Sequence, residues 1–518
     1  MANRLSAVSE RGRSIEWYDE VIGDGAMKSV YFSPDRSYVV QFMKVRPSPD
    51  SIQRLRDICM AKRDSLVTPD LVGQYWEKLF CWPYDIVEHN GRIGLVAPAY
   101  DKRFFFAHGA RDEGGNKLSL KGKEKQGKWF ATGWHRAKLD VRELGDFRTL
   151  LSACLLLARG VRKMHLMGLA HSDLSYRNVL VDPSTGRSAI IDVDGLVVPG
   201  KIPPQVQGTP DFIAPEVVAT AHLQGAAQKL PSDRTDRHAL AVLIYMYLLK
   251  RHPLRGRRNL GEAEEDERLQ MGERALWIED PDDLSNRPDL RDPDEREENK
   301  RWLDVEALPY TSLGPFLAPL VSKAFRAGLK NPDARPRADD WEDALVRSVD
   351  LLVRCANPAC NDRWFMLNMQ GIDGPAPVPR RTQACPFCKT TVSGQIPFLN
   401  FYTHRRVEGV GKYLIDGRKL VLFDGQELML WHASSKPEFA PSERLTDDMR
   451  KRVGYFQFHQ ERWYLTNVNM PNLKVFEAGS SRSVPRGKPL MLSEAMQLQF
   501  DSPENDGRMA TVQIAGRR

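Results

Sequence analysis

The stretch GLAHSDLSYRNVLVD, residues 168–182, carries His171, Asp173 and Asn178 between apolar flanks. The simplest interpretation is a turn whose polar side chains satisfy the backbone. The alternative is a site that binds a metal ion and accepts a proton from a hydroxyl group. A further carboxylate, Asp192, follows the apolar run AII and a DPSTG turn. Phosphoryl transfer from ATP requires this set, because one carboxylate orients the attacking hydroxyl while an amide and a second carboxylate hold Mg²⁺.

Hydrophobic periodicity predicts the elements that position these side chains. Apolar residues at helical spacing over residues 145–167 predict a largely buried helix that leads into the stretch. Residues 236–249, DRHALAVLIYMYLL, are apolar nearly all round and predict a core helix. Residues 15–100 are mostly β-rich, and SVYFSPDRSYVVQFMKV predicts a hairpin around its SPDRS turn.

The order of these residues resembles that of the eukaryotic-like, or Hanks-type, bacterial Ser/Thr protein kinases. Asp173 matches the catalytic-loop aspartate of that family, Asn178 its metal-binding asparagine, and Asp192 the magnesium aspartate that opens the DFG motif. The resemblance implies a bilobal fold, ATP and Mg²⁺ as cofactors, and transfer of a phosphate to a protein.

Later motifs extend the resemblance in the family's order. GTPDFIAPE, residues 208–216, is similar to the end of an activation segment with its APE motif. NPDARPRADDW, residues 331–341, is similar to the late kinase segment whose arginine, here Arg335, pairs with the APE glutamate, here Glu216. The resemblance therefore implies a structural ion pair between these two residues.

The nucleotide-binding residues are less clearly marked. IGDGAMKSVYF resembles a shortened glycine-rich loop, although a plain hairpin turn is the alternative. The phosphate-binding lysine matches Lys28 by position in the loop and Lys44 by distance from it, and we leave both open. The resemblance implies the following contacts: glycines Gly23 and Gly25, Lys28 or Lys44, the helix glutamate Glu77, and the hinge residues Ala97 and Ala99.

Three positions depart from the family pattern. Ser172 replaces the arginine of HRD, so control through a phosphorylated loop residue such as Thr209 does not carry over. Ser175 replaces the lysine that follows the catalytic aspartate in Ser/Thr kinases. DFG is replaced by DVDG, in which Asp194 adds a carboxylate for metal binding or an exposed turn residue.

Four of the seven cysteines form two close pairs. Cys355 and Cys360 are followed, after 24 residues, by Cys385 and Cys388. Two such knuckles suit tetrahedral Zn²⁺ in a structural site and resemble a zinc ribbon, whereas reduced core cysteines are the alternative. The other three cysteines are scattered, which is typical of a reducing compartment.

Short strands with turn signals follow from residue 404 to 518, and their order resembles a forkhead-associated (FHA) β-sandwich. The phosphate-binding motif of that family is not recognisable, so we expect an FHA-like fold used for protein contact. Kinase, ribbon and tail in this order resemble kinases of tellurite-resistance-type modules, which implies a von Willebrand A protein and a PP2C-type phosphatase as partners.

We therefore predict an α+β chain of four parts. They are a kinase N-lobe (15–100), a C-lobe (101–350) with insertions near 101–140 and 255–304, a zinc ribbon (351–400) and the FHA-like sandwich (404–518). A net charge of +7 argues against a nucleic-acid binder, and no apolar run is long enough for a membrane span or secretory signal, so we expect a cytoplasmic protein.

Three functions remain open at this point. The first is an enzyme, a protein serine/threonine kinase acting on a partner protein. The second is a pseudokinase scaffold that assembles a signalling complex through its ribbon and tail. The third is a small-molecule kinase, which the GTPDFIAPE segment disfavours.

Overall fold

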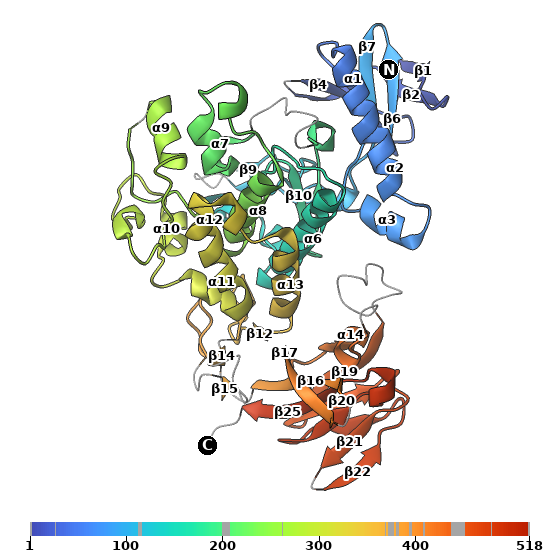
Figure 1. Ribbon diagram of the computed structural model, residues 1–518, viewed down its shortest axis with the longest axis vertical. Coiled ribbons are helices and arrows are strands. Elements are labelled where there is room, and N and C mark those ends of the chain that lie inside the picture. The colour runs from blue at the N-terminus through green and yellow to red at the C-terminus, as the bar shows by residue number, and fades with distance from the viewer. Residues whose placement is uncertain are drawn as a thin grey trace. The chain divides into compact units, whose positions relative to one another are not determined.

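The protein is described from a computed structural model that covers residues 3–25, 27–111, 117–198, 208–261, 263–367, 369–370, 378–379, 383–392, 396–407, 410–436, 451–477 and 479–515 (Figure 1). The chain divides into two compact units. The first consists of Met1–Gly145, Ser152–Val305 and Val321–Asp339, and the second of Asp146–Leu151, Glu306–Leu320 and Asp340–Arg518. None of the described helices is long and apolar enough to cross a membrane.

An antiparallel sheet of five strands, blue in Figure 1, forms the N-terminal part of the first unit. The predicted hairpin around the SPDRS turn is present, and its register places Lys28 opposite Met43. Trp17 from a preceding two-stranded hairpin packs against Phe42 on one face of the sheet, with ring centroids 5.1 Å apart. The sheet order is β3 (Val21–Asp24), β4 (Lys28–Phe32), β5 (Tyr38–Met43), β7 (Arg92–Pro98) and β6 (Asp85–His89), and the hairpin is β1 (Arg4–Val8) and β2 (Ser14–Tyr18).

A helix connects β5 to β6 and contains a widened turn. The α-helix α1 (Pro49–Arg56) continues through a π-helical turn, η1 (Asp57–Lys62), into α2 (Arg63–Leu66). The hydroxyl of Ser48 caps its start by accepting the N–H of Ser51. Its buried face carries Leu55, Ile58 and Cys59, and also Arg54. A short helix, α3 (Leu71–Glu77), follows and is capped by Asp70.

Two long helices organise the rest of the first unit. The predicted buried helix over 145–167 is confirmed as α6 (Phe147–Leu166), and the predicted core helix as α8 (Asp233–Leu249). Every side chain from Leu240 to Tyr245 is fully buried, as expected for a helix that is apolar all round. Between these helices β10 (Val179–Asp182) pairs with β11 (Arg187–Ile190) across the predicted turn, and α7 (Pro215–Thr220) precedes α8.

Both segments that we predicted as insertions contribute to the core. Phe130 from 101–140 and Trp277 and Trp302 from 255–304 are almost fully buried. The mostly polar composition of these segments conceals their contribution to the core. A few aromatic side chains are enough for it, because each buries a large area. The first segment contains η2 (Lys102–Phe104), β8 (Ala110–Arg111), β9 (Lys117–Leu118), α4 (Lys128–Ala131) and α5 (Gly133–Ala137), and the second contains α9 (Glu264–Met271), η7 (Leu284–Asn286) and α10 (Glu297–Leu303).

The second unit ends in an all-β region whose two sheets share one hydrophobic core. Phe401 and Val512 from one sheet pack in the same cluster as Phe456 and Leu465 from the other. One sheet is ordered β17 (Val410–Val421), β16 (Ile396–Val407), β25 (Met509–Ala515), β24 (Gln497–Gln499), β21 (Lys474–Glu477) and β22 (Ser480–Ser483). The other is ordered β18 (Glu427–Met429), β19 (Arg452–His459), β20 (Arg462–Asn467) and β23 (Pro489–Met491). β16 begins at Ile396, within the residues predicted as the ribbon (351–400).

Three helices follow later in the chain, α11 (Gly314–Phe325), α12 (Ala327–Lys330) and α13 (Ala338–Val349). The predicted ion pair before α13 is confirmed. Arg335 donates to both carboxylate oxygens of Glu216, at 2.8 and 2.6 Å, and its guanidinium is 1% exposed. It also donates to the carbonyl of Gly328. This arrangement ties the start of α7 to the chain before α13.

The substitution Arg335→Met should destabilise the first unit strongly, because it strands the Glu216 carboxylate and the Gly328 carbonyl. A loss of roughly 3–5 kcal/mol is typical when one partner of such a pair is removed. Differential scanning calorimetry should show the transition of this unit several degrees lower. The control is Arg337→Met, which removes a 64% exposed partner of Asp339 and should cost about 1 kcal/mol or less. Equal midpoints for the two variants would contradict a structural role of the pair.

Candidate active site

The loop between α6 and β10 carries the predicted catalytic residues, and buried contacts hold it in place. The backbone N–H of His171 donates to the carboxylate of Asp236 in α8 at 2.8 Å. The imidazole Nε2 of His171 lies 3.0 Å from the carbonyl oxygen of Ile191. Ser172 follows with φ at +61°, a left-handed conformation that turns the chain sharply. The core helix therefore sets the position of the next residue, Asp173.

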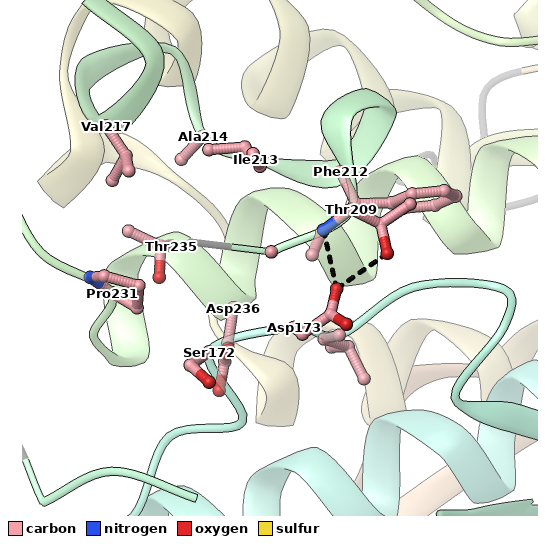
Figure 2. Close-up of a pocket in the computed structure, with 13 residues that line it drawn as sticks. Ser172, Asp173, Thr209, Phe212, Ile213, Ala214, Val217, Pro231, Thr235 and Asp236 are labelled. Atoms are coloured by element: carbon pink, nitrogen blue, oxygen red, sulfur yellow. Dashed lines mark hydrogen bonds between the residues drawn. The ribbon is translucent and has the colours of Figure 1, made fainter. Parts of the chain in front are cut away.

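The carboxylate of Asp173 is oriented by hydrogen bonds from both sides. Its Oδ1 accepts the backbone N–H of Thr209 at 2.7 Å and lies 2.8 Å from the Thr209 hydroxyl (Figure 2). Its Oδ2 accepts a hydrogen bond from the side-chain amide nitrogen of Asn178 at 3.0 Å. A cavity of about 20 Å³ beside Thr209 is large enough for a water molecule only. Thr209, the second residue of the described range 208–261, is thus held directly against Asp173.

A larger cavity, of about 290 Å³, is lined by Asp173 and Asp192 together. Asp192 follows β11 in a left-handed conformation, with φ at +59°. The ammonium group of Lys28, from the start of β4, lies 3.1 Å from a carboxylate oxygen of Asp192 and 2.7 Å from one of Asp194. Sequence analysis left Asp194 as a metal-binding or an exposed turn residue, and it is buried. We call this space the Asp192 cavity.

The electrostatics of the Asp192 cavity favour charged side chains. Burial alone would lower the pKa of Lys28, but the carboxylates of Asp194 and Asp192 raise it above its ordinary value. Burial opposes ionisation of Asp192, and the nearby Lys28 ammonium nevertheless lowers the pKa of that carboxyl. The lysine is therefore a cation and Asp192 an anion at neutral pH.

Of the other residues predicted for the glycine-rich loop, Gly25 lines the Asp192 cavity. The N–H of Gly25 donates to the carbonyl of Lys28 at 2.9 Å and closes the turn between β3 and β4, while Gly23 lies within β3. Lys44 lies elsewhere, because its ammonium pairs with Asp24 at 2.9 Å and both side chains are more than one-third exposed. The structure therefore separates the two lysines that the sequence left equal.

Glu77, Ala97 and Ala99 are not brought into the Asp192 cavity. The carboxylate of Glu77 pairs with Arg63 at 2.7 Å, so the expected lysine–glutamate pair is absent from the described residues, and the acids beside Lys28 are aspartates. Ala97 is buried in β7, and the N–H of Ala99 donates to the carbonyl of Ser37. Glu77 and Ala99 line a separate cavity of about 240 Å³.

Arg54, which no sequence motif marked, also lines the Asp192 cavity. The sequence did contain one indication of its role. Arg54 adjoins Leu55 on the buried face of a helix. Long basic side chains usually occupy the exposed face of such a helix, so a basic residue on the apolar face indicates a specific contact.

Oxygen atoms of the right kind for Mg²⁺ are available at this site. Asn178 uses its amide nitrogen to donate to Asp173, so its amide oxygen is the atom that would bind a cation. Carboxylate and amide oxygens are the ligands that Mg²⁺ prefers. The chemistry of this donor set therefore fits Mg²⁺.

The four predicted zinc ligands are gathered at one point of the second unit. The sulfur atoms of Cys355, Cys360, Cys385 and Cys388 all lie within 4.8 Å of one another. Cys355 and Cys360 follow β12 (Leu352–Arg354), which pairs with β13 (Trp364–Met366). Four clustered thiols from two short turns have the number and spacing that tetrahedral Zn²⁺ requires.

Comparison with known proteins finds a family model that is similar to part of the chain. Residues 145–304 match the family described as "Protein kinase domain". A solved structure of the kinase domain of a Toxoplasma gondii specific rhoptry antigen is 13% identical, covers 66% of this chain and 86% of its own, and superposes with a TM-score of 0.38. No curated protein matches the sequence.

The cysteine cluster leads to a prediction about metal content. The purified protein should contain one zinc ion per chain, measured by inductively coupled plasma mass spectrometry. Cys385→Ser should lose most of this zinc and lower the melting temperature of the second unit, because the fourth thiolate completes the coordination. Cys81→Ser, which changes a cysteine of the first unit, should keep the metal. Zinc near zero in the wild-type protein, prepared without chelators, would rule out this site.

Proposed function

We propose that the chain is an ATP- and Mg²⁺-dependent protein kinase that transfers the γ-phosphate to serine or threonine of a partner protein. The observation that carries the proposal is that Asp173, Asp192 and Lys28 line one cavity. The kinase-family match over residues 145–304 supports the same chemistry independently.

Asp173, Asp192 and Asn178 each have a role in this proposal. Asp173 accepts the proton of the attacking hydroxyl while the hydroxyl oxygen bonds to the γ-phosphorus of ATP and the bond to the β-phosphate oxygen breaks, leaving ADP. The hydrogen bonds from Thr209 and Asn178 fix the direction of that carboxylate. Asp192 and Asn178 would hold Mg²⁺, which supplies positive charge to the phosphates when bound.

Lys28 is the better candidate for the phosphate-binding lysine. Its ammonium already lies within the Asp192 cavity, beside the residue proposed to hold Mg²⁺. With Mg²⁺ held by Asp192, the ammonium group of Lys28 would be free to pair with phosphate oxygens. Lys44, which follows β5, instead has the exposed Asp24 as its partner.

The alternative, a pseudokinase scaffold, is favoured by one observation. Among the described residues, neither Lys28 nor Lys44 pairs with a glutamate, whereas active protein kinases require a lysine–glutamate pair. In this alternative the cavity binds nucleotide without transfer, and the protein acts by assembling partners.

For the second unit, we propose recruitment of partner proteins. The paired sheets around one core support an FHA-like fold, and the cysteine cluster supports a zinc ribbon. A von Willebrand A protein and a PP2C-type phosphatase are the candidate partners that the sequence resemblance implies. Co-purification with each of them, compared with a chain truncated after the ribbon, would test this recruitment.

Four variants test the catalytic assignment. Asp173→Ala and Asp192→Ala should each lower phosphate transfer from radiolabelled ATP by roughly 100-fold or more, because proton transfer and charge stabilisation are lost. Lys28→Met should lower phosphate transfer by a similar factor, whereas phosphate transfer by Lys44→Met should stay within about twofold of wild type. Acid hydrolysis of the labelled protein should yield phosphoserine or phosphothreonine.

The outcomes separate the hypotheses. Nucleotide binding by the wild-type protein with no transfer, whether to itself or to a co-purified partner, would support the scaffold and overturn the kinase. Loss of activity in Lys44→Met but not in Lys28→Met would reverse the lysine assignment.

A further inference from the structure

Arg54 is a buried arginine with no carboxylate partner among the described residues. The residue is only 8% exposed. Its Nη2 reaches the backbone carbonyl of Asp194 at 3.5 Å, at the limit of a hydrogen bond. Its Nε and Nη1 are buried and have no hydrogen-bond partner in the part of the chain that the structure describes. Leaving a buried charged group unpaired is costly, so this guanidinium is prepared for an anion.

The acids around Arg54 are already engaged with other groups. Asp194 and Asp192 both pair with Lys28, and Asp173 accepts hydrogen bonds from Thr209 and Asn178. His171, which also faces the cavity, contacts a backbone carbonyl through Nε2. Arg54 lines the Asp192 cavity, whose volume of about 290 Å³ leaves room for an anion to bind beside the guanidinium.

A phosphorylated side chain of the activation segment is not available as that anion. The stretch LVVPGKIPPQVQG, residues 196–208, contains no serine, threonine or tyrosine. The next residue, Thr209, directs its hydroxyl to the carboxylate of Asp173. Ser172, where the kinase family has an arginine, agrees with the absence of a loop phosphate. The activation segment therefore offers no phosphate group to Arg54.

We propose that Arg54 binds phosphate oxygens of the bound nucleotide and thereby links helix α1 to occupancy of the Asp192 cavity. This inference rests on the proposed function, because it assigns the phosphate end of the nucleotide to this cavity. A guanidinium offers several N–H donors in a planar fork that matches phosphate oxygens, so the two unpartnered nitrogens suit this ligand. Protein kinases in general place an acid on the corresponding helix to hold the lysine. Here the aspartates hold the lysine, and the helix contributes a second cation.

Binding of three ligands to the full-length protein, measured by isothermal titration calorimetry with Mg²⁺, tests this proposal. Arg54→Gln should weaken the binding of ATP and of ADP by roughly 10- to 100-fold, the factor expected for loss of a charge-assisted hydrogen bond. Its affinity for adenosine, which has no phosphate, should stay within about twofold of wild type. Arg54→Lys keeps the positive charge but lacks the planar guanidinium, so it should recover part of the ATP affinity. This variant also tests the proposal if Arg54→Gln does not fold.

The control is Arg56→Gln on the same helix, because Arg56 is 44% exposed and pairs with Glu10. It should bind all three ligands like wild type. If wild type binds ATP and both Arg54 variants bind it equally well, the Arg54 assignment fails and the proposed function stands. Equal weakening of ATP and adenosine would make Arg54 a structural residue and also overturn the assignment. If wild type binds no nucleotide, both proposals fail.

Discussion

A lysine held between two aspartates is the interaction on which the site depends. Lys28 stands at the first position of β4, and the register of β4 against β5 brings it to the cavity rather than to solvent. The two carboxylates come from the segment after β11. Without the ammonium group, the neighbouring carboxylates of Asp192 and Asp194 would repel each other. The ion pairs thus connect the N-terminal sheet to the helical part of the first unit.

The core helix α8 supplies the second constraint. Its first turn is polar, and the buried carboxylate of Asp236 holds the backbone of His171 while also lying 3.1 Å from the imidazole of His165. The remaining turns of α8 are apolar and closely packed, so the loop that bears Asp173 is attached to a rigid support. Such support is what positioning of reacting groups requires, because small displacements of a catalytic carboxylate are costly in rate.

Much of this arrangement could be predicted from the sequence, because its signals are local. The apolar pattern of 236–249, the SPDRS hairpin and the paired cysteines each define an element or a cluster through neighbouring residues. The order of the kinase motifs then linked Asp173 with Asp192, and Arg335 with Glu216. Residues distant in the chain were predictable only where a family pattern joined them.

The missed features depend on tertiary contacts. Lys28 and Lys44 could not be separated by sequence, since only the pairing of two strands decides which lysine faces the cavity. Glu77 was expected beside the lysine from the family resemblance, but the helix that faces the cavity lies earlier and carries Arg54 there. Polar composition of their segments likewise concealed the buried aromatic side chains of Phe130 and Trp302.

A crystal structure of the full-length protein with Mg²⁺ and a non-hydrolysable ATP analogue tests the central claim most directly. The account predicts Mg²⁺ about 2.1 Å from oxygens of Asp192 and Asn178, with Lys28 moved from the two aspartates onto the phosphates. A nucleotide bound elsewhere, or phosphates in the Asp192 cavity with Lys28 still paired to both aspartates, would contradict it.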